Sequence, residues 1–460
     1  MYYKRLIDRS LAEWAAKDSH KPLLLRGARQ VGKSTAVRHL GEQFANYVEI
    51  NFERQPNYKQ LFATDLDVKR IVSQMQALCG QRIKEGETLL FLDEIQQCPE
   101  AIMSLRFFKE DLPGLHVVAA GSLLEFALDQ LPTFGVGRIH SMFMHPMTFD
   151  EFLWANGEDL LMQERDRATP QSPLNEQLHQ KLVSLLRIYM LTGGMPEVVA
   201  KWVETHDFIQ CQEIQDDIIV SYEDDFPKYR KRIDPMALRL TMRNIAVQAA
   251  QKFVYANATG CDVRDVRNAV EMLILAGIVI PVTHSDANGL PLGAEANRSY
   301  RKLLIIDTGL MLRLLNMSLG DVSEITSQIL TATAADLVNK GSMAELLAGL
   351  ELQRVQPSNM RNELYYWQRQ AKNSLAEIDY ILPYRQSVLP IEVKAGVRGG
   401  MKSLWLFMRE KQLSRAVRCS LENFGEFTYI DVADNDAPRN VTICPLYAVS
   451  QMARVASSPN

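Results

Sequence analysis

Cysteine is sparse in this sequence, and its six residues are scattered with no CxxC pair among them. A zinc site or a disulfide framework is therefore not indicated. Long apolar runs are also missing, because none reaches the roughly 18 residues that span a bilayer. The charged stretch at residues 1–20 contains no apolar core of signal-peptide length. We therefore expect a cytoplasmic location and no membrane partner.

An excess of positive charge is lacking as well, because 51 Lys and Arg stand against 55 Asp and Glu, for a formal net charge of −4. A charge-driven nucleic-acid binder is usually basic, so any DNA site on this chain must be a local patch. What is present is an ordinary globular balance, with 47% apolar and 23% charged residues over 460 positions. Such a chain has room for roughly two to four domains, each with its own core.

Short apolar runs alternate with helical patterns up to about residue 150. Four runs, at residues 22–27, 47–52, 88–94 and 116–122, predict buried strands. Strands that alternate with helices predict a parallel sheet covered on both faces, so we place an α/β domain at residues 1–156. The polar stretch at residues 157–176 contains two prolines and predicts a loop or linker.

Helical spacing dominates residues 177–255 and is interrupted by TGGMPE at 192–197. Residues 261–284 then predict a helix, a glycine turn and a strand, and residues 301–310 predict a second strand. This is the outline of a winged helix, so residues 177–320 form a predicted helical and winged-helix segment. A predicted helix at 341–355 is followed by predicted strands at 363–370, 376–384 and 387–396, which define an α/β C-terminal domain at residues 335–455.

Residues 27–34 fit G-x-x-x-x-G-K-[ST] without a mismatch, directly after a predicted strand and at the start of a predicted helix. Glycines let the backbone wrap phosphates, so that N–H groups and the helix N-terminus point at negative charge. Lys33 would reach the β- and γ-phosphates, and the Ser34 hydroxyl would ligate Mg²⁺. The predicted ligands are therefore ATP and Mg²⁺, bound by Gly27, Ala28, Arg29, Gln30, Val31, Gly32, Lys33, Ser34 and Thr35.

Polar side chains follow two other predicted strands. Asp93 is suited to hold Mg²⁺ through water, and Glu94 to orient and deprotonate the attacking water. Ser122 would contact the γ-phosphate or that water, although a serine in an ordinary turn also fits. Arg138 would stabilise transition-state charge in a neighbouring subunit of a homo-oligomer. A solvated loop arginine explains Arg138 equally well.

Several of these runs together resemble a known family. LLLRGARQVGKS, LLFLDEIQQCPE, AAGSLLEF, GRIHSMFMHPMTFDEFL and LTGGMPEVV are similar to the prokaryotic AAA-type ATPases that carry a C-terminal domain of unknown function. The similarity continues through LLIIDTGL into YYWQRQAKNSLAEIDYILPYRQSVLPIEVKAG. It implies an AAA-type P-loop core, a winged-helix segment and a restriction-endonuclease-like C-terminal module. Ser34 stands where threonine is commoner in such loops, and it preserves the hydroxyl.

The C-terminal strands carry Asp379, Glu392 and Lys394. A hairpin turn centred on residues 385–386 would put Asp379 across from Glu392, with Cβ atoms roughly 5 Å apart. Two carboxylates so close need a cation between them, and a divalent ion is the usual one. The pattern resembles the PD-(D/E)xK nuclease motif, whose preceding helix supplies a further metal ligand. Glu345 matches that position, and Glu351 is the alternative.

The preferred hypothesis is an ATPase that couples nucleotide state to binding or processing of DNA, branched or single-stranded. In it, Asp379, Glu392, Glu345 and Lys394 form a metal-dependent nuclease site, and a surface hairpin with solvated charges is the alternative. Arg264 and Arg267 on the winged-helix segment and the basic cluster at 228–232 would contact phosphates, or else lie on solvated or protein-binding faces. The rivals are a nucleotide-gated switch with an inert nuclease-like domain that acts on protein partners, and a protein-remodelling AAA chaperone.

Overall fold

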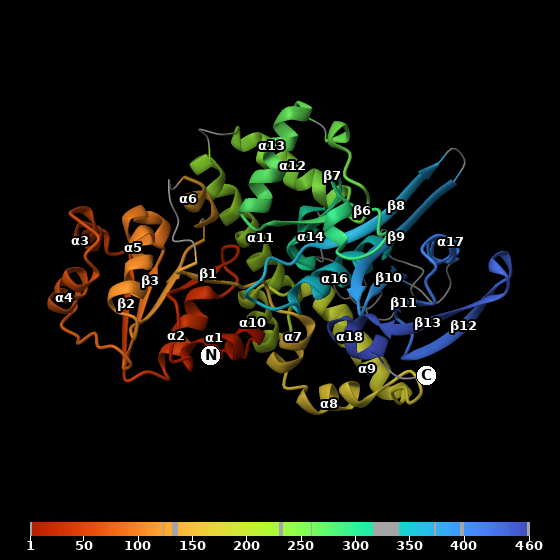
Figure 1. Cartoon of the computed structure of the whole chain (residues 1–460), viewed down its shortest axis with the longest axis horizontal. Helices are drawn as coiled ribbons and strands as arrows, with labels where there is room; N and C mark the ends of the chain where they lie inside the picture. The colour runs from red at the N-terminus through yellow and green to blue at the C-terminus, as the bar shows by residue number, and fades with distance from the viewer. Residues whose placement is uncertain are drawn as a thin grey trace. The chain divides into compact units, whose positions relative to one another are not determined.

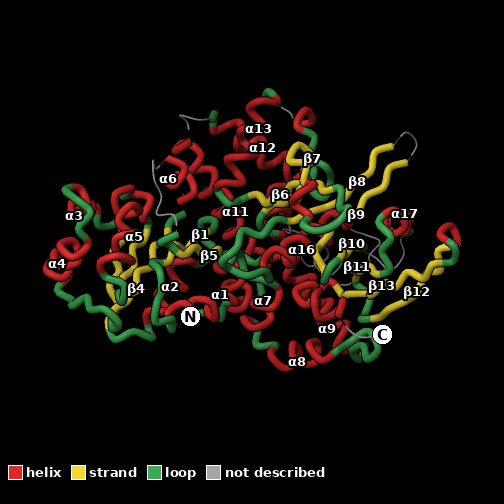
Figure 2. The backbone as a smooth tube through the Cα atoms, viewed as in Figure 1, coloured by secondary structure: helices red, strands yellow, loops and turns green. Residues whose placement is uncertain are grey.

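The computed structural model describes residues 2–122, 124–130, 137–229, 233–258, 260–315, 340–371, 374–395 and 400–457. The chain divides into two compact units, whose elements are labelled in Figure 1 and distinguished by type in Figure 2. Unit 1 comprises Met1–Met147, Leu275–Gly277 and Pro357–Arg361. Unit 2 comprises Thr148–Ile274, Ile278–Gln356 and Asn362–Asn460.

A parallel sheet forms the centre of unit 1. Within the described residues its five strands follow the order β2-β3-β4-β1-β5, so β4 lies between β1 and β3. The four strands predicted at 22–27, 47–52, 88–94 and 116–122 are confirmed as β1 to β4, whereas β5 carries no apolar run that would predict it. The elements are α1 (Leu6–Ala15), β1 (Leu23–Arg26), α2 (Lys33–Gly41), β2 (Asn46–Asn51), α3 (Gln60–Ala63), α4 (Val68–Cys79), β3 (Thr88–Asp93), α5 (Pro99–Asp111), β4 (His116–Ala120), α6 (Leu124–Gln130) and β5 (His140–Phe143).

The strands of this sheet are buried because helices cover them. Leu90 and Leu92 of β3 belong to one apolar cluster with Met75 of α4 and Leu105 of α5, and all four side chains are fully buried. Burial of one such side chain stabilises the fold by about 1.5–3 kcal/mol. The continuous apolar run of β3 therefore holds its last residue, Asp93, at a defined place on the carboxyl edge of the sheet.

Unit 2 begins with helices, and one of them corrects a prediction. Residues 157–176 are not a plain linker, because α8 lies within them and buries Leu161, Met162 and Arg165. Arg165 pairs with Asp150 at 2.5 Å, and the two prolines of the stretch come only after the helix ends. The helices are α7 (Phe149–Ala155), α8 (Asp159–Arg167), α9 (Glu176–Thr192), α10 (Pro196–Thr205), α11 (Phe208–Asp225), α12 (Pro235–Val247), α13 (Val263–Leu275) and α14 (Thr308–Leu314).

A mixed sheet forms the rest of unit 2. Its eight strands, counted over the part of the chain that the structure describes, follow the order β12-β13-β11-β10-β9-β8-β6-β7. The predicted helix at 341–355 and the predicted strands at 363–370, 376–384 and 387–396 are confirmed. The elements are β6 (Val279–Ser285), β7 (Ala296–Ile305), α16 (Lys340–Arg354), β8 (Leu364–Ala371), β9 (Ser374–Tyr384), β10 (Ser387–Val393), α17 (Lys402–Glu410), β11 (Arg415–Ser420), β12 (Gly425–Asp431), β13 (Ala437–Pro445) and α18 (Met452–Ser457).

The β6–β7 hairpin follows α13, as the outline of a winged helix predicts. It does not stand alone, because β6 also pairs in parallel with β8. One sheet therefore runs across the boundary that the sequence suggests between residues 320 and 335. Helix α16 contacts β7, β8 and β10, so it lies against strands from both sides of that boundary. Among the described helices, none combines the length and apolarity needed to cross a bilayer.

Candidate functional site

The loop between β1 and α2 has the backbone geometry of a phosphate-binding loop. Gly27 has a φ of 143° and Gly32 a φ of 95°, values that residues with a Cβ atom rarely adopt. A Cβ atom on Gly27 would also lie 2.1 Å from the backbone oxygen of Met144. Glycine is therefore required at this position by both conformation and space, and the loop leads directly into the N-terminus of α2.

Lys33 lies buried in this loop. Its Nζ donates hydrogen bonds to the backbone oxygens of Gly27 at 3.0 Å and Ala28 at 2.7 Å. Burial lowers its pKa to about 8, although the charges of Glu94 and Asp93 oppose that change. A bound phosphate would add negative charge beside the ammonium and favour its charged form. The geometry thus presents a partly desolvated cation where phosphates would sit.

Ser34 and Asp93 meet at the carboxyl edge of the sheet. The Ser34 hydroxyl donates to the two carboxylate oxygens of Asp93 at 3.1 and 3.2 Å. The Asn51 side chain donates to the same carboxylate at 3.0 Å from the end of the neighbouring strand β2. Burial and the charge of Glu94 raise the pKa of Asp93. A hydroxyl and a carboxylate are oxygen donors that suit Mg²⁺, so these residues fit the expected ion.

Glu94 follows β3 in a left-handed conformation, with φ 50°. The Gln96 side-chain amide donates to the Glu94 carboxylate, and Gly121 faces the same amide from the end of β4. A Cβ atom on Gly121 would lie 1.9 Å from the Gln96 oxygen. Asn51, Gln96 and Gly121 were not singled out in the sequence. Only its polar side chain, one residue before the end of the predicted strand 47–52, could have indicated Asn51.

Ser122 and Arg138 are placed differently from one another. Ser122 follows β4, which lies between β1 and β3, so it shares the carboxyl edge of the sheet with the loop and Asp93. Arg138 is more than half exposed and pairs with Glu110 at 2.6 Å. The roles of Ser122 as a γ-phosphate contact and Arg138 as an arginine finger stay predictions.

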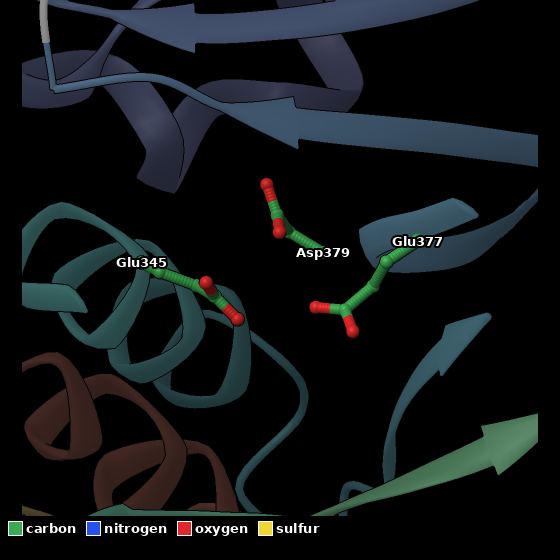
Figure 3. Close-up of side chains that lie close together, drawn as sticks. All are labelled: Glu345, Glu377 and Asp379. Atoms are coloured by element: carbon green, nitrogen blue, oxygen red, sulfur yellow. The ribbon is translucent and has the colours of Figure 1, made fainter. Parts of the chain in front are cut away.

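A second cluster of chemistry-bearing residues lies in unit 2. Among the described residues, Glu345, Glu377 and Asp379 are placed so that one carboxylate oxygen of each lies within 4.8 Å of the others. The three side chains extend toward one another from α16 and β9 (Figure 3). Glu377 was not singled out in the sequence. Its position two residues before Asp379 on the same strand could have indicated it.

Lys302 of β7 occupies the middle of this acidic cluster. Its Nζ lies 2.7 Å from Glu345 Oε1, 2.5 Å from Glu377 Oε1 and 3.8 Å from Asp379 Oδ1, and its side chain is completely buried. Burial by itself lowers the pKa of Lys302, but the charges of the three carboxylates outweigh it and raise the pKa. Sequence reasoning missed this lysine, because it merely precedes the apolar run of the strand at 301–310.

The predicted hairpin has the expected turn. In the hairpin of β9 and β10, Tyr384 pairs with Ser387 and Tyr380 pairs with Ile391. The turn is therefore centred on residues 385–386. On its other side, β9 is irregular against β8, with two residues between Ile378 and Ile381 facing a single residue of β8. The extra residue forms a β-bulge at residues 379–380, and such a bulge changes the direction in which the side chains point.

Glu392 and Lys394 pair with each other rather than with the three clustered carboxylates. The Asp379 carboxylate instead accepts a hydrogen bond from the backbone N–H of Val393 at 2.7 Å. Burial and the charge of Asp379 raise the pKa of Glu392 to about 7. The structure thus places Glu345 close to Asp379, and the metal-binding and catalytic roles of these two residues, of Glu392 and of Lys394 stay predictions.

Glu351, the alternative to Glu345, faces other partners. Its carboxylate accepts from the backbone N–H of Phe149 at 3.0 Å and from the Tyr189 hydroxyl at 3.4 Å. Of the two helix carboxylates considered for a metal site, Glu345 is therefore the one that reaches Asp379.

Comparison with known protein families agrees with the geometry of unit 1. Residues 19–153 match a family model described as an AAA domain. Residues 183–321 match a domain of unknown function (DUF8612), and residues 340–434 match a domain of unknown function (DUF4143). No curated protein matches the chain. Residues 19–153 thus form a P-loop domain of the AAA ATPase type.

Several solved structures show loose similarity. A Walker-type ATPase of Pyrococcus abyssi is 15% identical, with a TM-score of 0.44 over 69% of this chain and 96% of its own. A RuvB variant of Thermotoga maritima is 14% identical, with a TM-score of 0.29 over 59% of this chain and 87% of its own. PCH-2 of C. elegans is 11% identical, with a TM-score of 0.23 over 43% of this chain and 55% of its own. With TM-scores below 0.5, none of these similarities defines the function of the chain.

Proposed function

We propose that the protein is a Mg²⁺-dependent ATPase that couples ATP binding and hydrolysis to DNA binding. The observation that supports hydrolysis most directly is the hydrogen bond from the Ser34 hydroxyl to Asp93, next to the buried Lys33. Lys33 would bind the β- and γ-phosphates, with the loop N–H groups of residues 27–35 around them. Mg²⁺ held by Ser34 and, through water, by Asp93 would neutralise phosphate charge.

Glu94 is the proposed general base. It would hold the attacking water and accept its proton on a carboxylate oxygen, while the Gln96 amide fixes the orientation of that carboxylate. Ser122 would contact the γ-phosphate from the same edge of the sheet. Arg138 would act on the site of a neighbouring subunit, which makes a homo-oligomer part of this proposal.

Coupling to DNA is the finer part of the proposal. It is supported by Arg264 and Arg267, both exposed on α13, the helix that leads into the β6–β7 hairpin. Part of the basic cluster at 228–232 lies outside the described residues, so it adds nothing here. The limits 1–156, 177–320 and 335–455 stay the proposed domain limits.

The test is the rate of ATP hydrolysis with single-stranded, duplex or branched DNA added. A rise in rate that is lost in an Arg264→Ala/Arg267→Ala double variant would support coupling to DNA. The matched control is Lys201→Ala, a basic residue on α10 that pairs with Glu204. If no form of DNA changes the rate of ATP hydrolysis or binds the protein, the proposed coupling to DNA is wrong. A nucleotide-gated switch that acts on protein partners then becomes the preferred function.

A specific observation favours the second candidate, a nucleotide-gated switch with an inert nuclease-like domain. A metal-dependent nuclease needs a divalent ion among Glu345, Asp379 and Glu392. The Lys302 ammonium, however, lies next to the carboxylates of Glu345 and Asp379, where such an ion would bind. DNA cleavage with Mg²⁺ or Mn²⁺ that disappears in Glu392→Ala would establish the nuclease.

A further inference from the structure

The acidic cluster of unit 2 already contains a cation. Three carboxylates, those of Glu345, Glu377 and Asp379, approach within 4.8 Å of one another, and such a group repels itself unless positive charge lies among them. Lys302 supplies that charge, at hydrogen-bonding distance from Glu345 and Glu377. The lysine side chain is completely buried, and its Nζ contacts the carboxylates of Glu345 and Glu377 directly.

Two of the three N–H donors of Lys302 have carboxylate partners. An ammonium has three N–H donors. One is directed to Glu345 and one to Glu377, and the Tyr366 ring lies 5.1 Å from Nζ as a cation–π partner. The N–O distances of 2.5 and 2.7 Å are those of charge-assisted hydrogen bonds, whereas Mg²⁺ requires about 2.0–2.1 Å to each oxygen. Lysine and a divalent ion therefore cannot share this position.

A second ammonium group lies beside the same carboxylates. Including Glu392 and Lys394, the group holds four carboxylates and two ammonium groups. Lys394 pairs with Glu392, so each of the two ammonium groups contacts at least one carboxylate of the group. The three carboxylates that contact Lys302 come from α16 and β9, while Lys302 comes from β7.

We infer that Lys302 is the resident cation of this cluster, that it takes the place of a divalent metal ion, and that the cluster fastens β7 to α16 and β9 instead of cutting DNA. The inference is independent of ATP hydrolysis and of DNA binding, because it concerns only the cation among Glu345, Glu377 and Asp379. Removal of the lysine side chain should open a site for Mn²⁺ that the wild-type protein lacks.

The experiment measures Mn²⁺ binding to the whole chain, without nucleotide, by electron paramagnetic resonance. Wild type, Glu377→Gln, Lys302→Ala and the double variant Lys302→Ala/Glu377→Gln are compared. We expect wild type and Glu377→Gln to bind the same number of ions. Lys302→Ala should bind one more, and the double variant should lose it. Thermal unfolding gives a second readout, in which Mn²⁺ raises the midpoint of Lys302→Ala by several degrees more than it raises that of wild type. Lys394→Ala, at the neighbouring lysine, is the control and should gain no ion.

Wild type that binds one ion more than Glu377→Gln would overturn the inference, as would wild-type DNA cleavage that Glu392→Ala abolishes. A folded Lys302→Ala that gains no ion would overturn the claim that the lysine takes a metal ion's place. If Lys302→Ala does not fold, the comparison of wild type with Glu377→Gln and with Glu345→Gln still decides whether the native cluster holds a divalent ion. The failure of DNA to stimulate ATP hydrolysis would leave this result unaffected.

Discussion

The Ser34 hydroxyl lies 3.1 Å from an Asp93 carboxylate oxygen, although 58 residues separate them in the chain. Ser34 is the second residue of α2, and Asp93 is the last residue of β3. In the sheet, β4 lies between β3 and β1, the strand that precedes α2. The contact brings together the two oxygen donors that the proposed Mg²⁺ site needs. The Asn51 side-chain amide donates a hydrogen bond to the same carboxylate.

Ser34→Ala should raise the Mg²⁺ concentration that gives half-maximal ATP hydrolysis by about tenfold, because a direct oxygen ligand is lost. Asn51→Ala should have a smaller effect in the same direction, since it only loosens the Asp93 carboxylate. The measurement is the hydrolysis rate as a function of Mg²⁺ at saturating ATP. An unchanged Mg²⁺ requirement in Ser34→Ala would place the ion elsewhere.

Lys33→Ala should abolish ATP binding, because it removes the buried ammonium that would contact the phosphates. Isothermal titration of ATP with Mg²⁺ measures the affinity directly. Arg38→Ala, which removes a partly exposed cation of the same helix that pairs with Glu49, should bind ATP normally. Retention of micromolar affinity by Lys33→Ala would contradict the assignment of the loop.

Glu94→Gln should keep ATP binding and lose turnover by on the order of 10²–10⁴, because the amide cannot accept the proton of the attacking water. The variant should therefore accumulate in its ATP-bound form. Single-turnover hydrolysis, measured alongside binding, separates the two effects. Normal turnover in this variant would show that the base lies elsewhere.

Gln96→Ala should lower turnover by about tenfold, the value of one lost orienting hydrogen bond to a charged group. Gly121→Ala should have a similar effect, since its methyl group would displace the Gln96 side chain. The double variant should then be no worse than either single one, because both changes remove one interaction. Additive losses would mean that Gly121 acts on catalysis independently of Gln96.

The buried carboxyl of Glu351 predicts a pH dependence of stability. Burial raises its pKa from 4.5 to about 7 in the folded protein, and its Oε2 has no hydrogen-bond partner among the residues that the structure describes. The folded state therefore binds the proton more tightly, and this stabilisation is fully present below about pH 4.5 and lost as the pH rises through 7. The contribution is about 3 kcal/mol at most.

Glu351→Gln removes this titration and keeps an oxygen for the Phe149 N–H. Urea unfolding of wild type and the variant at pH 5 and pH 8 measures the difference. The stability of the variant relative to wild type should increase between these values. If that relative stability stays constant with pH, the carboxyl group is not the titrating group.

The local elements could be read from the sequence to a large extent, and the exceptions have physical reasons. β1 to β4 are continuous apolar runs, and such runs are buried whatever their neighbours. β5, in contrast, consists of four residues without an apolar run and exists because it pairs with β1. Helix α8 was missed because the prolines that follow it suggested a loop over the whole stretch.

The two candidate sites differ in how many of their residues could be predicted from the sequence. Lys33, Ser34, Asp93 and Glu94 were found by spacing, since a phosphate-binding loop is a local motif and two acids at a strand end complete it. In the C-terminal part, spacing indicated Asp379, Glu392 and Lys394, and the resemblance to the nuclease motif indicated Glu345, but neither indicated Lys302. That lysine belongs to a strand some 40 residues before α16, and no local pattern connects the two.

The sequence by itself determined the nucleotide loop, the buried strands of unit 1 and the hairpin turn at residues 385–386, because each depends on residues close together in the chain. Only the tertiary structure decided which strands are neighbours, that β6 joins the C-terminal sheet, and that a lysine lies among Glu345, Glu377 and Asp379. These arrangements depend on contacts between distant segments. They are selected by the burial of apolar surface and the pairing of buried charges, which no short stretch of sequence contains.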